Sequence, residues 1–400
     1  MRERVLVTGL GVVSPFNPDG DRERFWEPLC AGETAVGAIR SFNASAYPCR
    51  VAAEVDRESL QSARPPADPA FCMAERAFEH ALQHAGIAPG SAAPRRAGII
   101  VGTVLGGTAS GERYLRARAQ HAPGATEALA QYPLRAVAAA LAEKARFSGP
   151  VLTVSTACAS GTDAIGLAYR RIASGSADVM VAGGVDAVCE LSFSGFCSLR
   201  ALTPDRVRPF SRNRTGLALG EGAAFLVLER EGSAKKRAAT PLGLIAGYAA
   251  RADAFHLTAP RRDGRGLAAA IKAALQDGAA GVDEIDYVSA HGTGTPYNDR
   301  METLALKTAF GARAQSVPIS SVKGALGHAF GAAGAIEAAV CLLAIRDGIV
   351  PPTANLEEPD PECDLDFVPG RARRMTVRTA LSVSAGFGGQ NAALLIRGWP

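Results

Sequence analysis

Residues 153–166 read TVSTACASGTDAIG and place a cysteine between a strand pattern and a helix pattern. The apolar run 151–154 is typical of a short buried strand, and residues 162–172 carry apolar side chains at helical spacing. Cys158 therefore lies at the expected start of a helix, among small neighbours. Unpaired N–H groups and the helix dipole favour the thiolate there, which is the nucleophilic form. A buried structural cysteine is the alternative, and this stretch alone does not decide between them.

A second stretch, residues 317–334, repeats the order of strand, small-residue loop and helix. Elsewhere the chain alternates strand and helix patterns, which favours a layered α/β fold. A polar segment, residues 231–240, separates two series of such patterns. The sequence therefore predicts two repeated α/β halves that share one site: residues 1–240 with the cysteine, and residues 241–400 with two histidines.

Composition excludes several classes of protein. The 400 residues are 48% hydrophobic and 20% charged, which argues against disorder. A net charge of +4 without a basic stripe argues against nucleic-acid binding, yet it permits an acidic protein partner. Eight scattered cysteines without a CxxC pair imply neither a disulfide framework nor a zinc knuckle. The apolar start is too short for a signal peptide, and the most apolar helix pattern, residues 332–345, is too short to cross a bilayer. We expect a cytoplasmic protein without a membrane span.

The motif SAHGTGTPYNDRME, residues 289–302, carries a histidine directly after a strand pattern. Glycines keep the backbone slim beside His291, and the hydroxyls of Thr293 and Thr295 suit a polar ligand. The alternative is a histidine with an ordinary structural role in a glycine-rich turn.

Two more motifs surround polar groups with small residues. The stretch SSVKGALGHAFGAAGAIE, residues 320–337, contains Lys323, His328 and Glu337. Buried charges are costly unless they pair or act, although an exposed loop is the alternative. In VSAGFGGQNAALL, residues 383–395, the glycines predict a turn that presents backbone N–H groups and Phe387 to a cavity. N–H groups aimed at one point can form an oxyanion hole.

Two other site types are disfavoured. Gly9 and Gly11 follow a strand pattern, but Ser14 stands where a dinucleotide-binding fingerprint has its third glycine. His291 and His328 are too far apart for a local metal motif, and no carboxylate at zinc-ligand spacing accompanies them. We therefore expect no metal.

One cysteine with two neutral imidazoles suits a particular reaction. After an acyl group is loaded on sulfur, a second thioester must lose CO₂ and become an enolate. Two N–H donors could stabilise the developing oxyanion, each contributing about 3 kcal/mol. The set therefore favours decarboxylative carbon–carbon bond formation over amide cleavage.

These four motifs, in this order over nearly the whole chain, resemble those of the β-ketoacyl-acyl-carrier-protein synthases, the elongating condensing enzymes of fatty-acid and polyketide synthesis. The resemblance implies the thiolase fold, two fused α/β halves in αβαβα layers, and a dimer. It implies an acyltransferase that condenses a cysteine-bound acyl group with malonyl-acyl-carrier protein to give a 3-oxoacyl product. Phosphopantetheine would arrive on the carrier, so no cofactor of its own is expected.

The resemblance also implies residue roles. Cys158 takes the acyl group, and His291 and His328 assist decarboxylation of the malonyl thioester. Lys323 organises the site electrostatically with three carboxylates: Asp299, Glu302 and Glu337. The N–H groups of Cys158 and Phe387 form the oxyanion hole, and Phe387 also gates the malonyl side. The phosphopantetheine arm would bind two hydroxyls, those of Thr293 and Thr295. Candidate contacts for an acidic carrier, with an ordinary solvated surface as an equal alternative, are Arg200, Arg206 and Arg208.

Some features depart from housekeeping elongating synthases. Residues 131–150, before the nucleophile, form a shorter segment, and Ala385 stands where a larger residue is usual. Residues 254–260 and 350–369 resemble polyketide ketosynthases of the dissociated type. Pathway, acyl chain, and the choice between a homodimer and a heterodimer with a ketosynthase-like partner stay open. The alternatives are a non-catalytic chain-length partner subunit, which would lack the nucleophilic cysteine, and a thiolase, which would need a second catalytic cysteine near the C-terminal end.

Overall fold

The computed structural model describes residues 3–60, 67–88, 96–122 and 125–399. Ten of its strands form one mixed sheet in the order β11-β10-β14-β15-β9-β1-β8-β6-β4-β5. The first half contributes β1 (Val5–Val13), β4 (Ala97–Gly102), β5 (Val151–Val154), β6 (Val179–Asp186) and β8 (Gly222–Arg230). The second contributes β9 (Gly243–Ala252), β10 (Tyr287–Ser289), β11 (Ile319–Ser320), β14 (Thr379–Gly386) and β15 (Gln390–Arg397). The halves join where β1 pairs antiparallel with β9.

The two halves repeat one pattern of strand directions. In the first, β6, β4 and β5 are parallel, and β8 runs antiparallel between β6 and β1. In the second, β14, β10 and β11 are parallel, and β15 runs antiparallel between β14 and β9. Strands β5 and β11, which open the two stretches predicted to be equivalent, both lie at the outer edge of their half. The predicted pseudo-repeat is confirmed.

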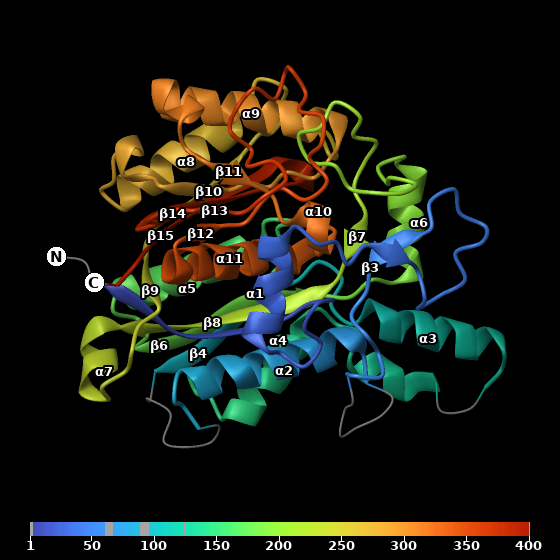
Figure 1. Cartoon of the computed structure of the whole chain (residues 1–400). Helices are drawn as coiled ribbons and strands as arrows, with labels where there is room; N and C mark the ends of the chain where they lie inside the picture. The colour runs from blue at the N-terminus through green and yellow to red at the C-terminus, as the bar shows by residue number, and fades with distance from the viewer. Residues whose placement is uncertain (1–2, 61–66, 89–95, 123–124, 400) are drawn as a thin grey trace.

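Helices separate and cover the two halves in five layers (Figure 1). On the outer side of the first half lie α2 (Pro69–His84) and α4 (Arg135–Ala145). Between the halves lie α5 (Ser160–Ala173) and α11 (Ala333–Asp347), each in contact with strands of both. The second half is covered by α8 (Arg265–Asp277) and α9 (Pro296–Phe310). This αβαβα arrangement is the one predicted.

The central position of α11 explains its composition. Residues 333–344 are all buried, and apart from Glu337 they are all glycine or apolar residues, as expected for a helix covered on every side. Close approach to α5 requires glycine at two points. A Cβ on Gly334 would lie 2.0 Å from Thr162 Oγ1, and one on Gly161 would lie 2.6 Å from the Gly331 carbonyl oxygen. Among the described residues, no helix is long and apolar enough to cross a membrane.

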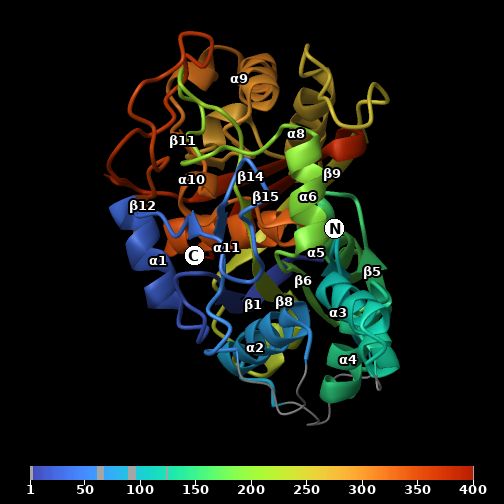
Figure 2. The same ribbon diagram turned by 90° about the vertical axis from the view of Figure 1, so that its right-hand side faces the viewer.

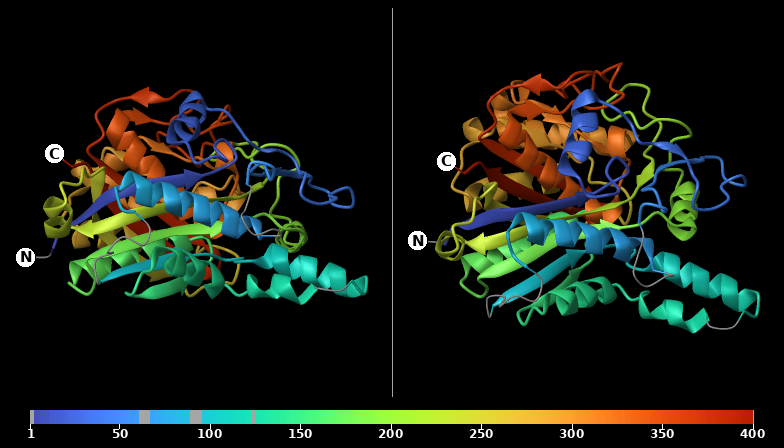
Figure 3. Two further views of the ribbon diagram at one scale, coloured as in Figure 1. Left: turned by 90° about the horizontal axis from the view of Figure 1, so that it is seen from below. Right: turned by 60° about the horizontal axis from the view of Figure 1, so that its bottom comes forward.

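The remaining elements surround this core. The helices are α1 (Arg22–Ala31), α3 (Thr108–Ala119), α6 (Glu190–Ser198), α7 (Glu231–Lys236) and α10 (Lys323–Leu326). Short strands are β2 (Gly37–Ala38), β3 (Val51–Ala53), β7 (Leu219–Gly220), β12 (Ile349–Val350) and β13 (Arg373–Arg374). Helix α3 extends away from the body of the molecule (Figure 3), and β5 lies at the outer edge of its half, against α4 (Figure 2). In the sequence, the polar segment 231–240 that separates the two halves contains α7.

Candidate active site

Cys158 lies in the turn between β5 and α5, just before the helix begins. Ala157 adopts a left-handed backbone conformation with φ +50°, which turns the chain sharply before the cysteine. The Ser160 side chain holds this turn, because its hydroxyl accepts from the Thr156 N–H at 2.9 Å and donates to the Ala157 carbonyl at 2.5 Å. The nucleophile candidate is therefore fixed on a short, braced loop.

The structure brings the cysteine and both histidines together. Cys158 Sγ and one ring nitrogen each of His291 and His328 lie within 4.8 Å of one another. The two imidazole rings meet edge to face, with centroids 5.4 Å apart, and each histidine is only 2% exposed. His291 follows β10, whereas His328 follows α10, so both come from the second half and the cysteine from the first. The predicted shared site is therefore formed in three dimensions.

A cavity of about 340 Å³ opens onto these three residues. Thr293 and Thr295 line it, and their hydroxyl oxygens lie 2.8 Å apart. The other lining groups named from the sequence are Arg200, Ala385 and Phe387. The cavity thus joins a thiol, two imidazoles and a hydroxyl pair.

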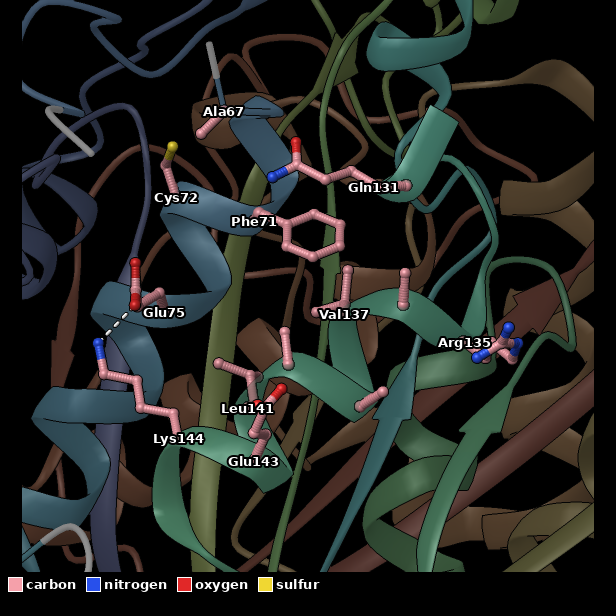
Figure 4. Close-up of a pocket in the computed structure, with 14 residues that line it drawn as sticks. Ala67, Phe71, Cys72, Glu75, Gln131, Arg135, Val137, Leu141, Glu143 and Lys144 are labelled. Atoms are coloured by element: carbon pink, nitrogen blue, oxygen red, sulfur yellow. Dashed lines mark hydrogen bonds and ion pairs between the residues drawn. The ribbon is translucent and has the colours of Figure 1, made fainter. Parts of the chain in front are cut away.

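A larger cavity of about 770 Å³ lies between α2 and α4 (Figure 4). Phe71 and Leu141 contribute apolar walls, and Lys144 pairs with Glu75 at its edge. It lies on the outer side of the first half and contains none of the predicted site residues. The smaller cavity is therefore the candidate active site.

The helix start favours a thiolate at Cys158, but the buried setting opposes it in the resting site. Burial raises the pKa of the thiol to about 11. A hydrogen bond from the Phe387 N–H, the charge of Lys323 and the N–H of Cys158 itself act in the opposite direction but are outweighed. The start of a helix favours a thiolate, but desolvation of the charge dominates here. Cys158 is therefore a thiol until a neighbouring group accepts its proton.

Both histidines are held neutral. Burial, and then the charge of Lys323, lower the pKa of His291 and of His328 well below the ordinary value. The Lys323 Nζ atom lies 3.4 Å from His291 Nδ1. Neither ring nitrogen of His328 has a hydrogen-bond partner among the described residues. A neutral imidazole can accept a proton at one nitrogen and donate from the other, so these rings suit both tasks.

Lys323 is itself buried and pairs with Glu337 on α11. Burial raises the pKa of the Glu337 carboxyl, and the Lys323 charge opposes that rise. The pair places one compensated cation beside the histidines, as the resemblance implied for these two residues.

The two other predicted carboxylates have a different task. Glu302 accepts from the backbone N–H groups of His291 and Gly292 at 2.6 and 2.7 Å, and burial raises its pKa to about 7. Asp299 accepts from the Gly294 N–H at 3.2 Å and, with its other oxygen, from the Phe210 N–H. Both carboxylates therefore brace the loop that carries His291. Lys323 still lowers the pKa of Glu302, but the ion-pair partner of Asp299 is another residue.

That partner is Arg214, which was not singled out from the sequence. Its buried guanidinium bonds to Asp360 at 2.6 Å and lies 3.9 Å from Asp299. It also donates to the carbonyl oxygens of Thr295 and Pro296, both at 3.3 Å. Arg214 thus joins three segments behind the threonine pair. No local pattern marks an arginine for burial, so only the tertiary structure reveals this role.

The turn after β14 faces the cysteine. A Cβ on Gly386 would lie 3.0 Å from the Cys158 nitrogen, so the two backbones approach closely. Next in sequence, Phe387 directs its N–H to the Cys158 sulfur, and its ring stacks on Phe196 at 5.6 Å between centroids. Two N–H groups, those of Cys158 and Phe387, therefore converge beside the Cys158 sulfur.

The three arginines proposed for carrier contact differ. Arg200 lines the cavity and is exposed, and Arg206 is exposed nearby in the sequence. Arg208, by contrast, forms two hydrogen bonds with Asp205, at 2.9 and 2.7 Å. Two of the three are therefore available to a partner, whereas the charge of Arg208 is already compensated.

A metal ion could reach the cysteine and both histidines, since their donor atoms lie within 4.8 Å of one another. The Lys323 ammonium, 3.4 Å from His291 Nδ1, would repel such an ion. The donor set thus fits nucleophilic chemistry better than metal binding.

Comparison with known proteins identifies the family. Two family profiles match the chain: "Beta-ketoacyl synthase, N-terminal domain" over residues 2–234 and "Beta-ketoacyl synthase, C-terminal domain" over residues 242–357. The chain belongs to the beta-ketoacyl synthase family and is a condensing acyltransferase with the thiolase fold. The resemblance inferred from the four motifs is confirmed.

Particular relatives cover the whole chain. The tetracenomycin polyketide synthase ketoacyl synthase alpha subunit of Streptomyces glaucescens is 40% identical over 99% of this chain and 97% of its own. The 3-oxoacyl-acyl-carrier-protein synthase 2 of Synechocystis is 38% identical over 99% and 98%. Among solved structures, the ishigamide ketosynthase/chain length factor has a TM-score of 0.93 and 36% identity, with complete coverage of both chains. A type II polyketide synthase acyl-carrier protein in complex with its ketosynthase, bound to a hexaketide, gives 0.91 and 33%, also with complete coverage.

Proposed function

We propose that this chain condenses an acyl group on Cys158 with malonyl-acyl-carrier protein, releasing CO₂ and a 3-oxoacyl-carrier product. The observation that carries the proposal is the meeting of one sulfur and two neutral imidazoles within 4.8 Å. A hydrolase of the cysteine type needs one imidazole as base, whereas decarboxylation to an enolate uses a second donor. Membership of a condensing family supports the same choice.

In the first step, the Cys158 sulfur attacks the acyl thioester of the carrier. The thiol, with its raised pKa, gives its proton to a neutral imidazole, and the carrier thiol leaves with a proton. The N–H groups of Cys158 and Phe387 would bind the oxyanion of the tetrahedral intermediate. The product is an acyl-enzyme thioester.

In the second step, malonyl-carrier protein occupies the same cavity. Loss of CO₂ leaves negative charge on the thioester oxygen, and His291 and His328 would each donate one N–H to it. Each donor contributes about 3 kcal/mol to the barrier reduction. The enolate carbon then attacks the Cys158 thioester, and the sulfur leaves. Burial, and then the charge of Lys323, keep both rings neutral, so each retains a free nitrogen for its task.

The substrates would arrive on a carrier protein. Thr293 and Thr295, which line the cavity, would bind the phosphopantetheine arm, and the exposed Arg200 and Arg206 would contact acidic carrier side chains. The carrier complex among the structural relatives supports this partner. The enzyme would then need no cofactor of its own. A polyketide synthase subunit and a 3-oxoacyl-acyl-carrier-protein synthase are both among its relatives, so either polyketide or fatty-acid synthesis fits.

We also propose that the protein is a dimer in the cytoplasm. Each chain would consist of two ketosynthase halves, divided near residue 240. Strand β5 ends the described sheet, and its Val151 and Leu152 are 41% and 37% exposed. An open strand edge of this kind favours pairing with a second chain. The partner could be a second copy or a ketosynthase-like subunit, and the relative described as a ketosynthase/chain length factor supports the latter. Cys158 argues against this chain being the non-catalytic member.

The test is product formation from acyl-carrier and malonyl-carrier thioesters, with release of CO₂ and the 3-oxoacyl-carrier mass as readouts. Cys158→Ala should abolish the condensation product. The matched control is Cys189→Ala, because Cys189 is also buried but does not line the cavity. Condensation at an unchanged rate in Cys158→Ala would overturn the proposal.

A further inference from the structure

A hydrogen-bonded chain links the nucleophile loop to the second half of the molecule. The Thr156 hydroxyl, two residues before Cys158, donates to the Asp163 carboxylate at 2.6 Å. The other oxygen of that carboxylate accepts from the Tyr248 hydroxyl at 2.8 Å. Asp163 lies in the first turn of α5, and Tyr248 lies on β9, so the chain of contacts crosses between the halves.

The packing around Tyr248 holds this chain in place. Its ring lies against α5 at Gly166, where a Cβ would come within 2.2 Å of the ring. The Arg170 side chain donates to the Tyr248 carbonyl at 3.0 Å and lies over the ring. Burial, and then Asp163, raise the pKa of Tyr248, which keeps its hydroxyl a donor. Asp163 is only 5% exposed, so the loss of either hydroxyl donor would leave a buried carboxylate oxygen without a partner and destabilise the loop.

The Thr156 backbone in turn lies against the turn that carries Gly386 and the Phe387 N–H. A Cβ on Gly386 would meet the Thr156 carbonyl oxygen at 3.3 Å and the Cys158 nitrogen at 3.0 Å. Between these residues, Ala157 holds a left-handed conformation that costs energy unless its surroundings maintain it. A shift of Thr156 would therefore move the Cys158 N–H relative to the Phe387 N–H.

We propose that Asp163 is a positioning residue for acyl transfer: through Thr156 it aligns the Cys158 N–H with the Phe387 N–H, and Tyr248 holds it in place. The inference rests on the proposed function, since it assumes that these two N–H groups bind an oxyanion. Misalignment of such a donor slows the reaction roughly 10- to 100-fold. A reaction of the same sulfur without an oxyanion would be spared.

The experiment compares two reactions of Cys158. The first is single-turnover acylation by an acyl-carrier thioester, and the second is alkylation by iodoacetamide, a displacement at carbon that forms no oxyanion. Variants are Thr156→Val, Asp163→Ala, Asp163→Asn and Tyr248→Phe. The matched control is Thr153→Val, because the Thr153 hydroxyl has no hydrogen-bond partner among the described residues.

Thr156→Val and Asp163→Ala should slow acylation roughly 10- to 100-fold while alkylation changes by less than about threefold. Tyr248→Phe should slow it by a smaller factor. Asp163→Asn, which keeps an acceptor for Thr156, should recover most of the rate, and Thr153→Val should match the wild type.

Three results separate the claims. If the wild type becomes acylated and Thr156→Val is acylated at the same rate, the role of Asp163 is overturned. The proposed function would then remain intact. Equal falls in acylation and alkylation across the variants would indicate a general structural role and would also overturn it. Failure of the wild type to become acylated, despite normal alkylation, would instead refute the proposed function.

Discussion

The charge of Lys323 provides a sharp test of the electrostatic part of the mechanism. At 3.4 Å from His291 Nδ1, a unit positive charge opposes protonation by about 5 kcal/mol at an effective dielectric constant of about 20. Glu337 offsets part of this, and burial is the larger cause of the lowered histidine pKa values. Removal of the charge should therefore raise these pKa values by about 1–2 pKa units.

The perturbation is the double variant Lys323→Met with Glu337→Gln. Removing Lys323 alone would leave a buried carboxylate without its partner and cost roughly 3–5 kcal/mol of stability, which would obscure the readout. The control is Lys307→Met, because Lys307 pairs with Asp364 at the surface.

The assay is the rate of CO₂ release from malonyl-carrier protein between pH 5 and 8. Neutral imidazoles are required, so the rate falls as the pH drops through the histidine pKa. In the wild type and in Lys307→Met, this acidic limb should lie well below pH 6.5, and in the double variant it should move upward. An acidic limb that stays in place would refute the assigned role of Lys323.

Three further predictions concern His328, the buried Arg214 and the buried Asp186. His328→Ala should leave Cys158 acylation intact but slow CO₂ release roughly 100-fold, and normal release would contradict its role as a donor. Arg214→Met should lower the free energy of unfolding in urea by roughly 3 kcal/mol, because two buried carboxylates lose their cation. The control is Arg212→Met, at an exposed position. An equally small change in both variants would argue against this account. Burial raises the pKa of Asp186 to about 6, so its contribution favours folding at low pH and is lost as the pH rises through about 6. Asp186→Asn should accordingly flatten the fall in unfolding free energy between pH 4 and 7, and an unchanged slope would count against it.

The sequence contains enough local information to predict the repeat and to single out the three side chains that meet at the cavity. Strand patterns and small-residue loops mark Cys158, His291 and His328 because nucleophiles and imidazoles at strand ends are few, and their chemistry is specific. Two similar stretches predict two similar halves, whereas the αβαβα layers are implied by the family resemblance.

Other parts of the site depend on contacts that no sequence pattern encodes. Burial depth decides that Cys158 is a thiol at rest, although its place before a helix favours the thiolate. Asp299 was expected to act with Lys323, but the distant Arg214 is its partner. Asp163 was not singled out from the sequence, and only its contacts with Thr156 and Tyr248 show that it links the two halves beside the Cys158 loop.

The central claim is that a single sulfur carries the acyl group. Incubation with acyl-carrier thioesters, followed by peptide mass spectrometry, should place the acyl adduct on Cys158 alone, and Cys158→Ala should give an unlabelled protein. An adduct on another of the eight cysteines, with Cys158 unmodified, would contradict the account.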